Sequence, residues 1–157
     1  MSSGVSDRVI VPFALVDTGL RWHVRAFDRR HGEFRDFVVT RIEAPQELDE
    51  LPQPNELPGN DIQWTRIVEL DFVPHPRLVR PEIVRMDYGM KEGVLHMRVR
   101  AAVAGYMLLR WSVDCSPDHR LTEEQYRLWL ADPLALYGVE NASLAPGYQP
   151  PVKQQEP

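Results

Sequence analysis

Arginine and histidine side chains alternate with apolar ones between residues 21 and 42, and these are the residues that could do chemistry. The alternation has a period of two and is interrupted by a polar turn that ends in a glycine, which predicts a β-hairpin. His23 and Arg25 fall on one face of the first predicted strand, and Arg35 and Arg41 share a face of the second. The hairpin would therefore present cationic groups among aromatic and aliphatic ones.

Two interpretations fit these cations. Guanidinium groups are rarely buried without a partner, and their planar fork suits bidentate capture of phosphate. This favours a basic, aromatic-lined pocket for an anionic ligand. The alternative is a solvated strand face on which arginine stems lie over apolar neighbours. The spacing alone leaves both interpretations open.

The same region contains four short motifs: Arg8–Pro12, Trp22–Val24, Gly32–Phe37 and Arg41-Ile42. In this order they resemble the WYL domain, a small Sm/SH3-like β-barrel found in bacterial transcription regulators and named for a Trp-Tyr-Leu tripeptide. Here a histidine, residue 23, occupies the tyrosine position and a valine the leucine position. A protonated histidine could donate to a phosphate as a cation, which tyrosine could not do.

The resemblance continues beyond the hairpin and covers roughly residues 7–145. Segments 71–76, 86–90 and 106–114 resemble the C-terminal extension of such regulators, especially those linked to phage-defence operons. The resemblance implies that this extension contributes to a homodimer. It also implies a winged helix-turn-helix that binds DNA ahead of the barrel. We expect that segment to be missing here, because the barrel begins almost at the first residue.

Composition narrows the class of protein. The chain has 157 residues, of which 43% are hydrophobic and 26% charged, which suits one ordinary globular domain or two small ones. The formal net charge of -5 argues against non-specific DNA binding by the whole surface. The sequence shows no apolar run that could span a bilayer and no secretory signal, so we expect a cytoplasmic protein without a membrane partner.

The sequence lacks the residues that several kinds of functional site require. Cys115 is the only cysteine, which excludes an internal disulfide and a cysteine-based zinc site. The histidines are scattered without the spacing of metal ligands: His23, His31, His75, His96 and His119. No glycine-rich phosphate loop and no grouping of nucleophile, base and orienting residue is present. We therefore expect no metal, no cofactor and no enzyme.

The predicted fold is mixed β and α+β, with four parts. They are the Sm/SH3-like barrel (residues 5–44), a Pro-rich acidic linker (45–61), a ferredoxin-like α+β module that dimerises (62–145) and a flexible tail (146–157). The order β-α-β-β-α-β is expected in the module. Thr122–Gln125 has the pattern of a capping box, which predicts a helix that runs to Ala131.

These observations favour a ligand-sensing, dimerising C-terminal region of a WYL-type transcription regulator. Its ligand would be an anion, either a nucleotide or single-stranded nucleic acid. Arg25, Arg35 and Arg41 are the expected phosphate ligands, His23 an adjustable donor, and Trp22 a packing residue rather than a stacking one. DNA would be bound only through the absent helix-turn-helix. The alternative is a stand-alone assembly module that dimerises without a ligand and whose arginines pair with acids.

Overall fold

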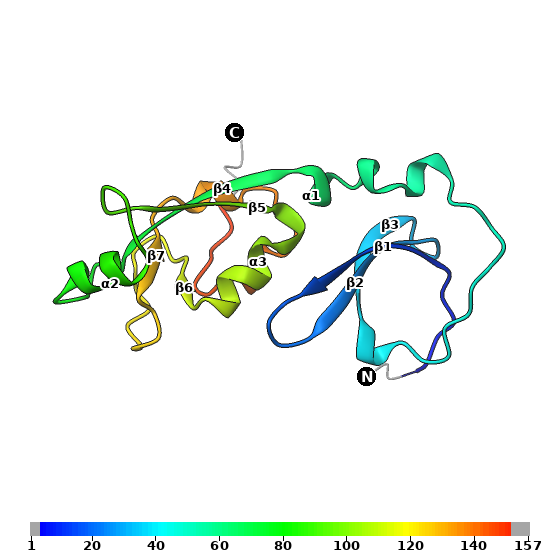
Figure 1. The fold of residues 1–157 in the computed structure, drawn as a ribbon, viewed down its shortest axis with the longest axis horizontal. Helices are drawn as coiled ribbons and strands as arrows, with labels where there is room; N and C mark the ends of the chain where they lie inside the picture. The colour runs from blue at the N-terminus through cyan, green and yellow to red at the C-terminus, as the bar shows by residue number, and fades with distance from the viewer. Residues whose placement is uncertain (1–3, 152–157) are drawn as a thin grey trace, which may run out of the picture. The chain divides into compact units, whose positions relative to one another are not determined.

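The computed structural model describes residues 4–151, and the chain divides into two compact units, Met1–Ile62 and Gln63–Pro157 (Figure 1). The N-terminal unit contains one antiparallel sheet of three strands in the order β1-β2-β3. These strands are β1 (Ile10–Asp17), β2 (Trp22–Asp28) and β3 (Glu33–Val38). The predicted hairpin is therefore confirmed as β2 and β3. Its second strand ends at Val38, so the expectation that Arg41 shares a strand face with Arg35 was wrong.

The two turns of this sheet are determined by local chemistry. Between β1 and β2, the Asp17 side chain accepts a hydrogen bond from the Gly19 amide, and Gly19 has a φ of 81°. Between β2 and β3, Gly32 adopts a φ of 68° and its amide donates to the Asp28 carbonyl. The closed barrel that we expected is not found in the described part of the chain, because this unit has only three strands and they form an open sheet.

The segment after β3 has no regular ladder, in agreement with its proline content. It contains three short 3-10 turns: η1 (Val39–Arg41), η2 (Pro54–Glu56) and η3 (Pro58–Asn60). Two of its acidic side chains, Glu56 and Asp61, are nevertheless buried. The segment that we predicted as a linker thus contributes carboxylates to the interior of the N-terminal unit.

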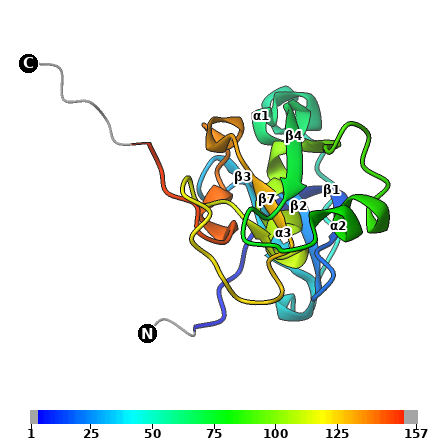
Figure 2. The ribbon, with the colours of Figure 1, turned by 90° about the vertical axis from the view of Figure 1, so that its left-hand side faces the viewer.

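The C-terminal unit is built on a mixed sheet of four strands in the order β5-β4-β7-β6. The strands are β4 (Ile67–Pro74), β5 (Leu95–Arg100), β6 (Val113–Asp114) and β7 (Leu128–Leu130). β4 is antiparallel to β5 and to β7, beside which it lies in Figure 2, whereas β6 and β7 are parallel. The remaining elements are α1 (Ile62–Thr65) at the unit boundary, α2 (Pro81–Asp87), α3 (Ala101–Arg110), η4 (Pro133–Leu136) and η5 (Ala142–Leu144).

The core of this unit follows from the alternation of apolar and charged side chains along β4. Val68, Leu70 and Phe72 of β4 point inward, while Glu69 and Asp71 point to solvent. Helix α3 adds small residues and one leucine to the same cluster, which also receives leucines from β7 and η4. None of the helices within residues 4–151 is long and apolar enough to cross a membrane.

Two expectations for the C-terminal unit were wrong. Residues 128–130 form β7 instead of the end of a helix, because Leu128 and Leu130 are buried and their strand pairs with β4. The observed order is therefore β-α-β-α-β-β, and the parallel pair of β6 and β7 gives a sheet order that differs from the ferredoxin-like module we expected. Burial of two leucines outweighed a local capping signal.

Candidate anion-binding site

The structure does not bring the four predicted ligand residues together. His23 and Arg25 lie on one face of β2, and the pairing of Ala26 with Arg35 places Arg35 on the opposite face of the sheet. Arg41 is exposed in η1, just after the end of β3. Arg25 therefore lies on a different face from Arg35.

Arg25 is held by carboxylates of its own unit. Its Nε and Nη2 donate to the two Asp61 carboxylate oxygens at 2.7 and 2.9 Å, and its Nη1 donates to Asp36 at 3.3 Å. Both Arg25 and Asp61 are buried. Burial alone would lower the pKa of Arg25, but the hydrogen bonds with Asp61 and the charge of Asp36 raise it. Arg25, one of the expected phosphate ligands, is therefore paired with acids of its own unit.

His23 is buried beside Arg25, with its Nε2 3.5 Å from the Asp36 carboxylate. Burial, together with the positive charges of Arg25 and Arg21, lowers the pKa of His23, and the opposing effect of Asp36 is smaller. The imidazole is therefore neutral at neutral pH. A cationic donor at this position, as the sequence suggested, would require a lower pH.

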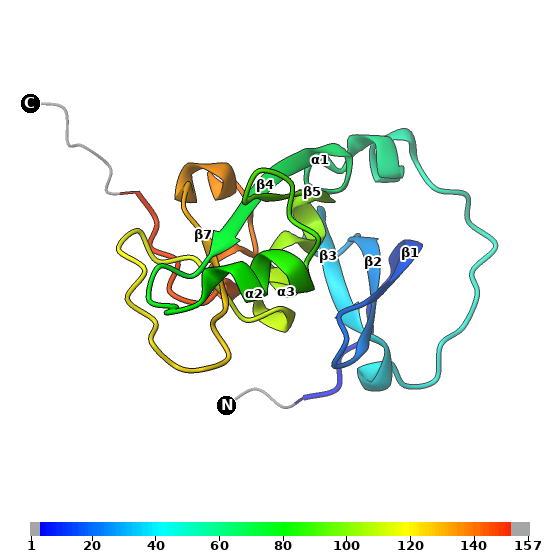
Figure 3. The same ribbon diagram turned by 60° about the vertical axis from the view of Figure 1, so that its left-hand side comes forward.

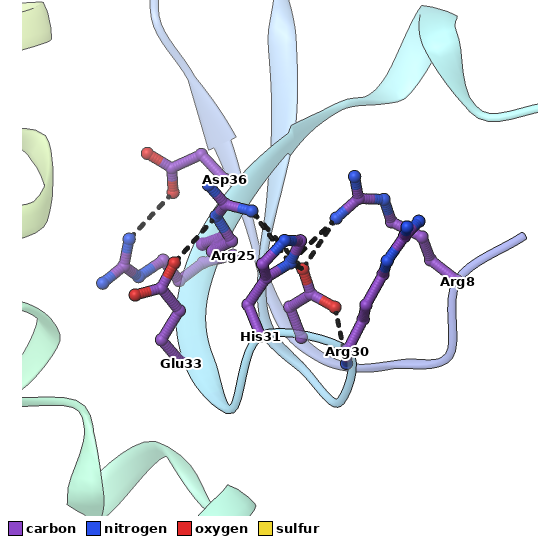
Figure 4. Close-up of polar contacts among 8 residues, drawn as sticks. Arg8, Arg25, Arg30, His31, Glu33 and Asp36 are labelled. Atoms are coloured by element: carbon purple, nitrogen blue, oxygen red, sulfur yellow. Dashed lines mark hydrogen bonds and ion pairs between the residues drawn. The ribbon is translucent and has the colours of Figure 1, made fainter. Parts of the chain in front are cut away.

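Basic residues gather at the turn between β2 and β3, where Figure 4 shows Arg8, Arg30 and His31. Arg35 joins them, with its Nη1 3.0 Å from His31 Nδ1. We call Arg8, Asp28, Arg30, His31 and Arg35 the Asp28 cluster. The fully buried Asp28 carboxylate accepts from Arg8 Nη1 at 2.8 Å and lies 2.6 Å from His31 Nδ1. It also accepts from the Arg30 amide, and Arg35 Nη1 is 3.6 Å away.

The cluster carries more positive than negative charge. Burial alone would raise the pKa of Asp28, but the hydrogen bonds from His31 and from the Arg30 amide, with the charges of His31 and Arg8, lower it. Asp28 is thus ionised, and Glu33 adds a second carboxylate 3.2 Å from Arg35 Nε. The guanidinium of Arg30 is exposed and takes part in no ion pair among residues 4–151.

An aromatic side chain lies on the same face of the sheet as Arg35. Trp22, at the start of β2, leaves 53% of its surface exposed. The expectation that it packs rather than stacks on a ligand stays a prediction. Its strand neighbours on this face are Val24 and Ala26, which lead to Asp28 at the far end of β2. The face therefore combines an exposed indole with the basic Asp28 cluster.

Sequence reasoning missed four members of the cluster, Asp28 among them. Arg30 and His31 stand in the turn Asp28-Arg-Arg-His-Gly, where the density of basic residues was a usable signal. Arg8 gave no such signal in the sequence. It precedes β1, and it comes close to Asp28 only because β1 pairs with β2. Spacing along the chain cannot show such a contact.

A second polar network lies inside the C-terminal unit. His75 Nε2 donates to Asp114 at 2.8 Å, and Asp114 also accepts from the Ser116 hydroxyl at 2.6 Å. All three side chains are buried. The serine donates to the aspartate rather than to the histidine, so the arrangement is not that of a nucleophile and its base.

The remaining reactive groups offer no catalysis either. Cys115 is buried, and burial, with the nearby Asp114 charge, raises the pKa of its thiol to about 12. No group of three or more histidine, cysteine or acidic side chains that could hold a metal ion is present in the described part of the chain.

Comparison with known protein families identifies both parts of the chain. Residues 1–47 match the WYL domain, and residues 67–136 match the family described as "BrxR transcriptional regulator, C-terminal dimerization domain". The chain therefore belongs to the WYL-domain proteins and combines this domain with a BrxR-type C-terminal region. The resemblance recognised from its motifs is confirmed.

Individual relatives are similar over most of the chain. It is 31% identical over 121 residues to the DNA-binding transcriptional repressor CapW of Escherichia coli (strain KTE188), a match that covers 75% of this chain and 39% of the relative. It is 32% identical over 110 residues to CapW of Pseudomonas aeruginosa, covering 69% and 36% of the two chains. The chain thus spans about two fifths of the length of these relatives. Their class agrees with the expectation that the chain is not an enzyme.

Proposed function

We propose that this chain is the ligand-sensing and dimerising region of a WYL-type transcription regulator. The observation that carries the proposal is the Asp28 cluster, in which the guanidinium groups of Arg8 and Arg35, an imidazole and the Arg30 backbone amide surround one buried carboxylate. Such an excess of cations favours an anionic ligand. Contact with DNA would belong to a helix-turn-helix in a longer protein, because the CapW relatives are DNA-binding transcriptional repressors.

The ligand that the geometry favours is single-stranded nucleic acid rather than a mononucleotide. Arg35 and Arg30 lie at one end of β2, whereas exposed Trp22 and Arg41 lie toward its other end. Strand β2 rises about 3.3 Å per residue, so these ends are roughly 20 Å apart. An extended strand with several phosphates and stacking bases could contact both ends, which a single nucleotide could not.

The four residues predicted from the sequence take different parts in this proposal. Arg35 and Arg41 would contact phosphates directly. Arg25 and His23 lie on the other face, so a ligand would reach them only if Arg25 exchanged its Asp61 partner for a phosphate. The simpler role for Arg25 is to hold the 45–61 segment in place.

The test is binding of a labelled oligothymidylate, followed by fluorescence anisotropy at several salt concentrations. Arg30→Ala with Arg35→Ala should weaken binding about tenfold or more and reduce the salt dependence, because charge-assisted contacts to phosphate are lost. Arg8 and His31 remain in this variant, so Asp28 keeps its partners. Arg98→Ala, which removes an exposed arginine of β5, is the matched control. Unchanged affinity in the double variant would remove the sensor hypothesis.

A second function, an assembly module that needs no ligand, is favoured by a different observation. Besides Arg25, Arg29 is paired within the chain: its Nε donates to Glu56 at 2.9 Å and a second contact reaches Glu50. Arginines that form ion pairs with acids of their own unit need no ligand to neutralise them. Light scattering with and without the oligonucleotide separates the two functions, because only the sensor should bind it.

A further inference from the structure

His31 lies in the turn between β2 and β3, at the end of the sheet where all three strands meet. β2 lies between β1 and β3 (Figure 3), and the register places Ile10, Asp28 and Glu33 in one row at this end. The His31 side chain is 40% exposed, whereas the Asp28 side chain that it contacts is fully buried. The imidazole therefore joins the interior of the Asp28 cluster to solvent.

The Nδ1 atom of His31 has more close neighbours than one nitrogen can satisfy. It lies 2.6 Å from Asp28 Oδ2, 3.2 Å from Arg8 Nη1 and 3.0 Å from Arg35 Nη1 (Figure 4). The guanidinium nitrogens can only donate, and an ionised carboxylate can only accept. Nδ1 can therefore serve one kind of neighbour or the other, depending on where the imidazole proton lies.

The contact with Asp28 decides the position of this proton. It is the shortest of the three contacts, as expected for a charge-assisted hydrogen bond to a carboxylate. The two arginines have other acceptors, because Arg8 Nη1 donates to Asp28 at 2.8 Å and Arg35 Nε lies 3.2 Å from Glu33. Nδ1 of His31 therefore carries the hydrogen, and in the neutral ring the lone pair belongs to Nε2.

The second ring nitrogen of His31 is open to a ligand. Nε2 takes part in no hydrogen bond or ion pair with the residues that the structure describes, 4–151. In the neutral ring it presents a lone pair, which repels a phosphate oxygen. In the protonated ring it presents an N–H group and a positive charge. Protonation thus turns an acceptor that opposes an anion into a donor that binds one.

Charged groups face this imidazole from every element around it. Arg8 comes from the segment before β1, Arg30 is its neighbour in the turn, and Arg35 comes from β3. These three cations oppose a further positive charge, whereas Asp28 of β2 and Glu33 of β3 favour it. A bound phosphate adds negative charge and shifts this balance toward the protonated ring. The proton and the anion should therefore bind together.

We propose that His31 makes the Asp28 cluster a pH-dependent anion site, in which protonation at Nε2 supplies an additional donor to the phosphate. This inference rests on the proposed function and adds its regulation. The role of adjustable donor, predicted from the sequence for His23, falls to His31. By linkage, an anion that prefers the protonated ring takes up a proton on binding, and its affinity rises as the pH falls.

The first experiment measures the affinity of the full chain for labelled oligothymidylate between about pH 5 and 8, the range in which histidine ordinarily changes its charge. Neither thymine nor the phosphodiester titrates in this range. The affinity of the wild-type chain should rise about tenfold from the upper to the lower pH, because one charge-assisted contact is gained. Fluorescence anisotropy measures the affinity, and far-UV circular dichroism at each pH verifies that the chain stays folded.

Two variants assign the effect to one residue. His31→Asn keeps a donor near the position of Nδ1 but cannot gain a charge, so its affinity should not change with pH. His96→Asn is the matched control. His96 is also exposed and its Nδ1 lies 2.5 Å from Asp71, but it belongs to β5 in the other unit. This control should retain the pH dependence of the wild-type chain.

Isothermal titration calorimetry gives a second measurement. In the middle of the same pH range, the dependence of the binding enthalpy on the ionisation enthalpy of the buffer gives the number of protons taken up. The wild-type chain and His96→Asn should take up a fraction of a proton with oligothymidylate, and His31→Asn none. A variant that still binds but takes up no proton has lost the titrating group and not the fold.

The outcomes separate this inference from the proposed function. Binding that does not depend on pH, or a pH dependence and proton uptake that persist in His31→Asn, refutes the role of His31 and leaves the anion site in place. A wild-type chain that binds no oligothymidylate at any pH overturns both proposals.

Discussion

Arg25 donates two hydrogen bonds to the Asp61 carboxylate, and both side chains are buried. Removing one partner from a buried ion pair leaves an uncompensated charge, which costs more than the pair itself contributes. This contact joins β2 to the end of the acidic segment, 36 residues along the chain. It therefore closes a long loop within the N-terminal unit.

Asp61→Asn should lower the free energy of unfolding of the N-terminal unit by about 3–5 kcal/mol. Arg25→Met should do the same, because Asp61 and Asp36 then lose their shared cation. The double variant Arg25→Met with Asp61→Leu should cost clearly less than the sum, since no buried charge is stranded. Urea unfolding followed by circular dichroism measures all three variants, and strict additivity would contradict the coupling.

At this scale, part of the site could be predicted and part could not. The alternation of residues 21–42 placed Arg25 and Arg35 on strands, and the basic turn was visible in the sequence. Which carboxylate meets which arginine was not visible. Asp61 and Glu56 come from a proline-rich segment whose path follows no period, so their burial could be learned only from the folded unit.

Helix α3 packs closely against Asn141, just before η5, at Gly105. A Cβ on Gly105 would lie 2.0 Å from the Asn141 carbonyl oxygen, and the Asn141 side chain accepts from the Gly105 amide while donating to the Ala102 carbonyl. The amide of Asn141 thus joins α3 to the segment before η5. The close approach of two backbones requires that residue 105 have no side chain.

Gly105→Ala should therefore destabilise the C-terminal unit by about 1–3 kcal/mol or more, as overpacking does. At an open helix position the same change would be favourable by about 1 kcal/mol, so the sign reports the clash. Thermal unfolding measures it. Gly59→Ala is the control, because a Cβ there meets nothing within 4 Å. A stabilised Gly105→Ala variant would show that Asn141 can move away without cost.

Hydrogen bonds to the Asp114 side chain hold the segment after β6 in place. Its carboxylate accepts from the Ser116 amide at 2.8 Å, from the Ser116 hydroxyl and from the Leu121 amide, and His75 donates to it as well. Burial alone would raise the pKa of Asp114, but these hydrogen bonds lower it below its usual range.

A lowered pKa in the folded state means that the stabilisation is complete above the unfolded value of about 3.9 and is lost as the pH falls through the folded pKa. The free energy of unfolding of the C-terminal unit should therefore decrease on acidification in this range. Asp114→Asn should lower it at neutral pH and flatten the acid slope, as urea titrations at several pH values would show. Exposed Asp118→Asn serves as the control. An equal slope in wild type and Asp114→Asn would exclude this carboxylate as the cause.

For the whole molecule, the family and the two-part order could be read from motifs, whereas the topology could not. The alternation of β4 and β5 and the helical spacing in α2 and α3 are visible in the sequence, because each of these elements has its own period. β7 was mistaken for part of a helix, because three residues are too few to show the period of a strand. A short strand is specified by the partner that it pairs with, and here that partner is β4, more than 50 residues earlier in the chain.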